Sequence, residues 1–157
     1  MKTFLLLLMT WVLIPGDLAA QNFETDHESQ SEILKLGFLT GNWEGEGWMM
    51  GPDGKKHRFN QTEAVTFKLD STAILIEGHG EADGKSIHDA LAVISFNKEN
   101  KDYKFTSWLA NGRGGQFKAS IIDDKFYWYP NENMQYVISI NDKGQWYETG
   151  EMKQGDK

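Results

Sequence analysis

Leu39-Thr40-Gly41-Asn42-Trp43-Glu44-Gly45-Glu46-Gly47-Trp48 is the stretch that decides the fold of this chain. Side chains alternate in an extended segment, so Trp43, Gly45 and Gly47 share one face and the glutamates share the other. A bulky indole followed by two residues without side chains is typical of a strand that closes the floor of a barrel. The ring fills the bottom, and the glycines let the strand bend and leave space above it.

The first 20 residues have the pattern of a secretory signal peptide. Lys2 supplies a positive charge, Phe4 to Ile14 is apolar, and Ala20 is a small residue before Gln21. The apolar run is too short for a spanning helix, which needs about 20 apolar residues. We therefore expect a periplasmic or secreted protein, mature from Gln21, with no integral membrane segment after signal removal.

The composition narrows the function classes. The chain contains no cysteine, which excludes disulfides, thiolate metal sites, a cysteine nucleophile and a lipid-modified N-terminal cysteine. The net charge of −7 and the pI near 5.1 argue against a nucleic-acid partner, because nucleic acids attract basic surfaces. No spacing selects a metal, and we expect no cofactor.

Residues 21–35 form a polar segment that ends in a short helix, and residues 36–157 form one β-barrel domain. Thr25-Asp26-His27-Glu28 has the composition of a capping box, and Ile33, Leu34 and Leu36 give the helix an apolar side. A helix at this place would close one end of the barrel.

From Asn42 onward, extended segments alternate with short turns and no second helical pattern appears. Such spacing favours an all-β fold, an antiparallel meander that closes into a lipocalin-like barrel. A β-sandwich is the alternative, but its crossing connections usually need longer links. The nine expected strands span residues 42–50, 56–70, 72–80, 87–96, 103–110, 116–122, 126–129, 134–140 and 145–152.

The chain ends on Gln154-Gly155-Asp156-Lys157, which has the composition of a turn. No strand follows it, so we expect that the last strand of the meander is missing. Two strand edges would then lack partners, which favours self-association through these edges or pairing with another molecule.

Five segments carry a resemblance to known proteins. They are Gly41 to Gly47, Gln61-Thr62-Glu63, Ile76-Glu77-Gly78, His88 to Ser95 and Trp146 to Gly150. Together they resemble a bacterial domain-of-unknown-function family of small exported proteins with lipocalin-like (calycin) barrels, whose members usually continue with one more strand. A more distant similarity is to nitrobindin-type haem barrels. These bind iron through a histidine near the C-terminus, and this chain has no histidine after His88, so haem binding is not carried over.

Hairpin geometry aligns the first four strands, if the turns lie at Pro52 to Gly54, Asp70 to Thr72 and Ala82 to Lys85. The predicted opposing pairs are Trp43–Glu63, Gly45–Gln61, Glu63–His79, Val65–Glu77, His79–His88 and Glu77–Ala90. They bring together a group of polar and aromatic residues on one side of the sheet: Trp43, Gln61, Glu63, Glu77, His79 and His88. The same side carries Phe59, Phe67, Leu75, Ala90, Ala92 and Ile94. A mostly apolar surface with a few convergent polar groups is a candidate ligand pocket.

Three interpretations of this cluster remain open. It is a packed interior whose polar groups satisfy one another, a site for a small apolar or amphipathic ligand, or an acid–base or metal site built from Glu63, His79 and His88. Arg113, in a glycine-rich loop, could reach an anionic ligand at the barrel mouth. No residue is assigned a catalytic role. A third function class is an interaction module that pairs through an open strand edge.

Overall fold

The computed structural model describes residues 24–152 of the chain. The signal segment, its cleavage site and the turn at residues 154–157 lie outside the described residues.

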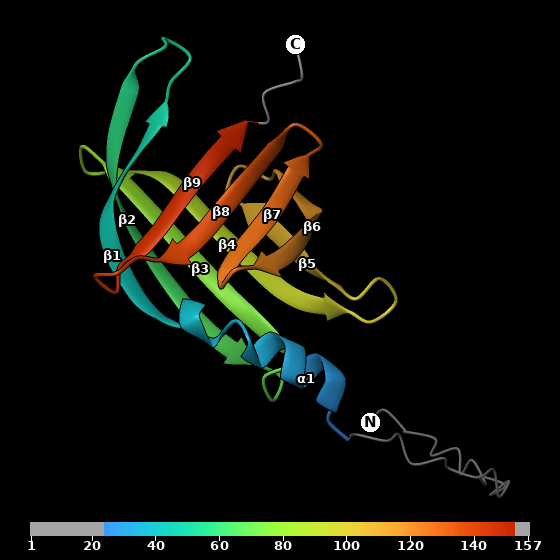
Figure 1. Ribbon diagram of the computed structural model, residues 1–157. Coiled ribbons are helices and arrows are strands. Elements are labelled where there is room, and N and C mark those ends of the chain that lie inside the picture. Colours follow the sequence, from blue (N-terminus) through green and yellow to red (C-terminus); the bar gives the residue numbers. More distant parts are fainter. Residues whose placement is uncertain (1–23, 153–157) are drawn as a thin grey trace, which may run out of the picture.

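Within residues 24–152, nine strands form one antiparallel sheet in which each strand pairs with the next along the chain. The sheet curls into a nearly closed barrel (Figure 1). This arrangement confirms the predicted all-β meander. The strands are β1 Gly41–Met50, β2 Lys56–Lys68, β3 Ala73–Ala82, β4 Lys85–Asn97, β5 Asp102–Leu109, β6 Gly114–Ile122, β7 Lys125–Asn131, β8 Met134–Ile140 and β9 Trp146–Met152.

Helix α1, His27–Leu34, and the short 3-10 helix η1, Gly37–Leu39, cover one end of the barrel (Figure 1). Asp26 is the N-cap, because its carboxylate accepts a hydrogen bond from the Ser29 backbone N–H at 3.2 Å. The neighbouring Thr25 instead donates to the Asp70 carboxylate at 2.6 Å, which ties the start of the helix to the β2–β3 turn. Neither helix of the described range is long and apolar enough to cross a membrane.

The apolar core lies at this covered end. Ile33, Leu36 and Leu39 are fully buried against residues that point inward from seven strands, β2 to β8. The strand residues of this core are Val65, Ile74, Ile76, Ala92, Ile94, Tyr103, Phe105, Ala119, Phe126 and Ile138. The Tyr103 hydroxyl donates toward the Glu32 carbonyl and carboxylate oxygens, at 3.2 and 3.0 Å, and so fixes α1 to β5.

Trp43 lies on the floor of the barrel, as predicted. It packs against the core, and its indole Nε1 donates to the Leu39 carbonyl oxygen at 2.9 Å. Gly45 and Gly47 follow on the same side of β1, and the Phe59 ring covers Gly47 so closely that a Cβ there would lie 2.5 Å from it. The glycine thus gives an aromatic ring room to lie flat on the barrel wall.

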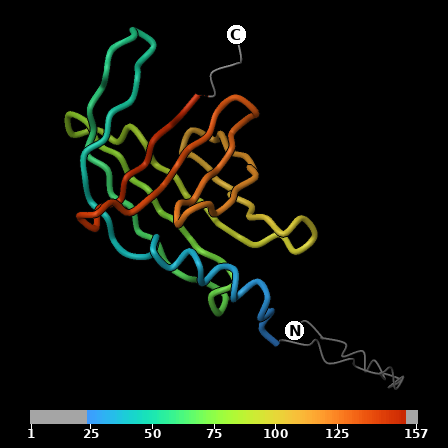
Figure 2. Tube along the Cα trace, viewed as in Figure 1, coloured from blue at the N-terminus to red at the C-terminus, as the bar shows by residue number. Residues whose placement is uncertain are grey.

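Strands β1 and β9 are the two edges of the sheet and do not pair with each other. They run in the same direction, because eight antiparallel steps separate them. Near their first residues the two strands are in contact through Trp43 and Trp146, whose ring centroids lie 5.8 Å apart. From there the two strands diverge toward their last residues (Figure 2). We call this boundary the seam.

The alignment of β1 with β2 is as predicted, with Trp43 opposite Glu63 and Gly45 opposite Gln61. The alignment of β2 with β3 differs from the prediction by one residue. Lys68 pairs with Ala73, so the turn at residues 69–72 is one residue longer than expected. Three of its residues have positive φ, at 52°, 54° and 61°, and none of them is glycine. A one-residue change in alignment turns every side chain of the strand to the opposite face.

A second difference lies between β3 and β4. The turn is as predicted, with Ala82 opposite Lys85, but a bulge at Ile87 shifts the alignment beyond it. The two one-residue differences cancel between β2 and β4, so His88 still faces inward. The prediction is wrong for Leu75, Glu77 and His79, which lie on the outer face. The observed pairs are Glu63–Gly78, Val65–Ile76, Gly78–Ala90 and Gly80–His88.

Candidate functional site

The candidate site is the half of the barrel interior that lies beyond the apolar core, away from α1. We call it the open half. The turns between β1 and β2, β3 and β4, β5 and β6, and β7 and β8 surround its mouth. The residues discussed below as part of it are Phe59, Gln61, Glu63, His88, Trp128, Tyr136 and Glu148.

Glu63 lies against the wall formed by β3. The Gln61 side-chain Nε2 donates to its Oε1 at 2.8 Å, and its carboxylate covers Gly78, where a Cβ would lie 2.7 Å from Oε2. Burial raises the pKa of Glu63, because a low-dielectric surrounding disfavours the charged form, and the hydrogen bond from Gln61 opposes this only in part.

Glu148 enters the same space from β9. It pairs with the buried Ile138, so its side chain faces inward, yet it is exposed. Burial among protein atoms, together with the charge of Glu63, raises the pKa of Glu148 to about 7, although the Trp128 and Trp146 indoles oppose this. The side chain of Glu148 is therefore surrounded by protein atoms, yet solvent can still reach it.

Two buried polar atoms in this region have no hydrogen-bond partner among the described residues: Gln61 Oε1 and Trp128 Nε1. Trp128 Nε1–H lies near enough to Glu148 to lower its pKa, but it forms no hydrogen bond with the carboxylate in this structure. Buried polar atoms are normally paired, because an unpaired one costs about 1–3 kcal/mol. The open half thus has unused hydrogen-bonding capacity.

Aromatic rings form the wall on the side of β5 to β8. Trp128 stacks on Tyr136 with centroids 4.4 Å apart and planes 6° apart, and its other neighbours are Phe105 at 4.8 Å and Phe117 at 5.3 Å. Burial and the charge of Glu148 raise the pKa of Tyr136, which places its hydroxyl in the field of that carboxylate. The polar groups therefore stand at the edge of a continuous aromatic surface.

The surroundings of Gly45 indicate unfilled space inside the open half. This residue lies on the inner side of β1, and a Cβ built on it would meet no atom within 4 Å. The neighbouring Gly47 is different, because the Phe59 ring fills its place. Gly45 therefore marks unfilled volume beside Gln61, its partner on β2.

His88 is the histidine that faces the open half. Burial lowers its pKa, the nearby Asp89 opposes this, and His79 lowers it further. The imidazole is therefore neutral near pH 7 and carries no positive charge toward Glu63 or Glu148.

Glu77 and His79 do not join the interior cluster. Both are exposed on the outer face of β3, where His79 Nδ1 lies 3.8 Å from an Asp89 carboxylate oxygen. The predicted two-histidine, one-carboxylate set is therefore not assembled. In the part of the chain that the structure describes, no group of three acidic or histidine side chains has the geometry of a metal site. Arg113 is exposed in the β5–β6 turn at the mouth.

The sequence interpretation missed Glu148, together with the aromatic residues around it. The signal is present in Trp146-Tyr147-Glu148-Thr149-Gly150, where alternation places a tryptophan, a glutamate and a glycine on one face. A charged residue between an aromatic residue and a glycine on the core-facing side is unusual. Recognising it requires knowing which face points inward, and the pairing of Tyr136 with Gly150 settles that.

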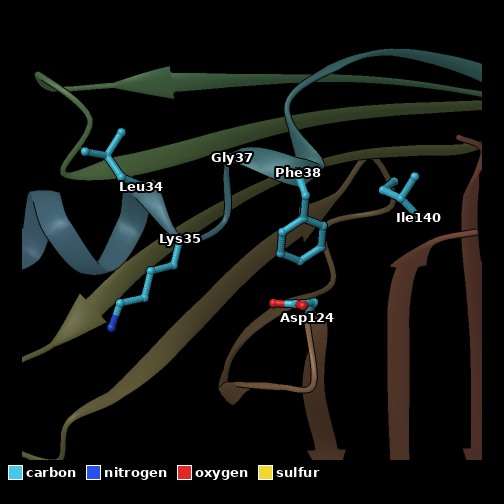
Figure 3. Close-up of a pocket in the computed structure, with 6 residues that line it drawn as sticks. All are labelled: Leu34, Lys35, Gly37, Phe38, Asp124 and Ile140. Atoms are coloured by element: carbon cyan, nitrogen blue, oxygen red, sulfur yellow. The ribbon is translucent and has the colours of Figure 1, made fainter.

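Two surface depressions lie outside the barrel interior. One lies at the covered end between the helices, the β6–β7 turn and the end of β8, and is lined by Leu34, Lys35, Gly37, Phe38, Asp124 and Ile140 (Figure 3). Its two charged residues do not converge: in Figure 3 the Lys35 side chain extends away from Asp124. The other lies near the mouth between β1, β2 and the β3–β4 turn, where Arg58 is 3.9 Å from Glu46. Neither has the unpaired buried groups of the open half.

A comparison of the chain with protein-family models gives no match, and a comparison with curated proteins gives none either.

Proposed function

We propose that this protein is an exported, lipocalin-like barrel that binds a small amphipathic molecule in the open half of its interior. One observation carries the proposal: Glu148 faces the barrel interior and is nevertheless accessible. A filled barrel would bury an inward-facing side chain at this level, as it buries Ile138 opposite. The aromatic wall would hold the apolar part of the ligand, and the unpaired polar groups would orient it.

The alternative of a merely packed interior accounts less well for the unpaired atoms. Natural interiors satisfy buried polar groups, and a self-contained packing arrangement would pair Gln61 Oε1 and Trp128 Nε1. Ligand sites leave such groups open because the ligand completes them.

Acid–base catalysis is a second candidate, and the Glu63–Glu148 pair favours it. A carboxyl group whose pKa lies near 7 is suited to give and take protons at neutral pH. The pair would act on a ligand bound in the same place, so both candidates share one binding step. Turnover of the bound molecule, measured in the wild type and lost in Glu148→Gln with binding retained, would support catalysis.

The binding test uses the neutral fluorescent probe N-phenyl-1-naphthylamine. Wild-type protein should bind it at one saturable site, with increased emission. Gly45→Phe would fill the open volume, and we expect it to weaken binding by about tenfold or more, a loss of about 1.4 kcal/mol. Glu44→Phe places the same side chain on the outer face of the same strand and should leave affinity unchanged. Equal affinities of both variants and the wild type would contradict binding inside the barrel.

Export is part of the same proposal and rests on the signal pattern of residues 1–20. The protein recovered outside the cytoplasm should begin at Gln21. Intact mass measurement of the exported protein checks this, and a retained Met1 segment would contradict it. The resemblance of five sequence segments to a bacterial family of exported barrels supports the same view.

A further inference from the structure

The charges inside the open half do not balance. Glu63 and Glu148 both face it, and neither takes part in any of the ion pairs among the described residues. His88 supplies no charge near pH 7, because burial lowers its pKa. Two carboxyl groups thus share a confined space without a positive group beside them. Such a pair repels itself once both members are ionised.

The unpaired hydrogen-bonding capacity is mostly of the acceptor type. Glu63 uses one carboxylate oxygen for Gln61 Nε2, and Gln61 Oε1 has no donor. Trp128 Nε1–H, the unpaired donor of this region, lowers the pKa of Glu148 without forming a hydrogen bond to it. A ligand that completes this group must bring N–H or O–H donors, and an ammonium group brings three.

The surrounding rings suit a positive charge as well. Trp146 and Tyr136 lie beside Glu148. The Trp146 indole lowers the pKa of Glu148, and the charge of Glu148 raises the pKa of Tyr136. The faces of tryptophan and tyrosine rings attract cations, and they do so more strongly where water is excluded. Carboxylates and aromatic faces together form the surrounding that recognises organic ammonium ions.

Resting on the proposed function, we propose that the ligand is an organic cation, a protonated amine on an apolar skeleton, and that Glu63 and Glu148 together hold its ammonium group. The skeleton would lie along the aromatic wall formed by Tyr136, Trp128 and Phe117. An anionic ligand such as a fatty acid would face two like charges and is excluded.

The proposal has a thermodynamic consequence. A cation beside Glu148 favours its ionised form and lowers its pKa, so binding near pH 7 must release a proton from this group. Affinity for an amine should therefore increase as the pH rises through about 7, as long as the amine itself stays protonated.

The test compares three probes of nearly the same shape by calorimetry: 2-phenylethylammonium, 2-phenylethanol and 3-phenylpropanoate. At pH 7.5 we expect the ammonium ion to bind about tenfold or more tightly than the alcohol, and the carboxylate to bind more weakly than either. Titrations at pH 6.8 in buffers of different ionisation enthalpy should show net proton release for the ammonium ion alone.

Variants test whether the two glutamates cause the preference for the ammonium ion and the proton release. Glu63→Gln and Glu148→Gln should each reduce the preference for the ammonium ion over the alcohol by about fivefold or more. Glu148→Gln should also abolish the proton release. Glu151→Gln is the matched control, because Glu151 lies on the same strand and pairs outside with Gln135 Nε2 at 2.9 Å. It should change neither quantity.

The outcomes separate this inference from the proposed function. If N-phenyl-1-naphthylamine binds and Gly45→Phe blocks it, but the ammonium ion binds no more tightly than the alcohol, the ligand site stands and the charge preference is wrong. If Glu151→Gln lowers the preference for the ammonium ion over the alcohol as much as Glu148→Gln does, this preference comes from the general negative charge of the protein surface and not from Glu63 and Glu148. If neither the naphthylamine nor any probe binds, both proposals fail.

Discussion

Glu63 and Glu148 reach the same part of the barrel interior from β2 and β9, on opposite sides of the seam. The charge of Glu63 adds to the effect of burial in raising the pKa of Glu148. No backbone pairing joins their strands, so the two carboxyl groups are the electrostatic link between the first hairpin and the last.

This link predicts a loss of stability with rising pH. Glu148 has an ordinary pKa near 4.5 when unfolded and one of about 7 when folded, so the folded state binds more protons between these values. The contribution is complete below about pH 4.5 and disappears as the pH rises through 7. We expect the free energy of unfolding of the wild type to fall by about 1–2 kcal/mol relative to Glu148→Gln across this range, less than the full shift implies because water reaches the side chain.

Urea unfolding of both proteins from pH 4 to 8.5 measures the difference. Glu151→Gln serves as the control and should follow the wild type. Parallel curves for the wild type and Glu148→Gln would show that this carboxyl group ionises as it does in the unfolded chain.

Trp43→Ala should strongly destabilise the fold. The substitution removes a large ring from the core, its hydrogen bond to Leu39 and its contact with Trp146. Emptying such a site typically costs about 3–5 kcal/mol. Glu44→Ala, on the outer face of the same strand, should cost within about 0.5 kcal/mol. Chemical denaturation compares them, and similar losses would contradict the assignment of faces on β1.

Gly78→Ala tests the position of Glu63. The new methyl group would stand 2.7 Å from the Glu63 carboxylate, which must move off the wall toward the interior and Glu148. We expect the pKa of Glu148 to rise further, with a change in stability of about 1 kcal/mol or less, since a flexible side chain yields rather than the backbone. NMR titration of the carboxyl carbons measures this. Gly45→Ala is the control, because its methyl group would meet no atom within 4 Å. If the pKa of Glu148 rises equally in Gly45→Ala, displacement of Glu63 is not the cause.

The unpaired edges predict self-association. Exposed apolar side chains accompany the edge of β1, where Trp48 is 52 % and Met50 58 % exposed. Backbone groups without partners on such an edge favour pairing between copies. Sedimentation over a range of concentrations should show association, and Met50→Glu should weaken it by about tenfold. Ile87→Glu changes an exposed residue at the β4 bulge, away from both edges, and should have no effect. A monomer at all concentrations would contradict the prediction.

The strand pattern could be predicted from the sequence because most turns carry their own chemical signal. Asp83-Gly84 is such a case: both residues have positive φ, as a two-residue hairpin requires, and the predicted turn is confirmed. The β2–β3 turn carries no such signal. Leu69 adopts positive φ at 52° although leucine rarely does, so nothing in the sequence fixes the length of that turn.

The candidate site was predictable only in part for the same reason. Gln61, Glu63 and His88 face inward as expected, but Glu77 and His79 changed faces with one additional turn residue. Glu148 lies on a strand that local turn geometry cannot relate to β2 at all. The two meet through the curvature of nine strands, which is a property of the whole sheet and has no local sequence signature.

The seam has a consequence for how this barrel can change its size. In a closed barrel the circumference is fixed, because widening it would break a complete ring of backbone hydrogen bonds. Here β1 and β9 meet through the rings of Trp43 and Trp146 at the floor, and their backbones do not pair above it. The girth of the open half can therefore grow or shrink by movement of β9 relative to β1 while each of the eight existing strand pairings stays intact. For the proposed ligand, the chemistry of the interior would therefore restrict binding more strictly than the diameter of the barrel does.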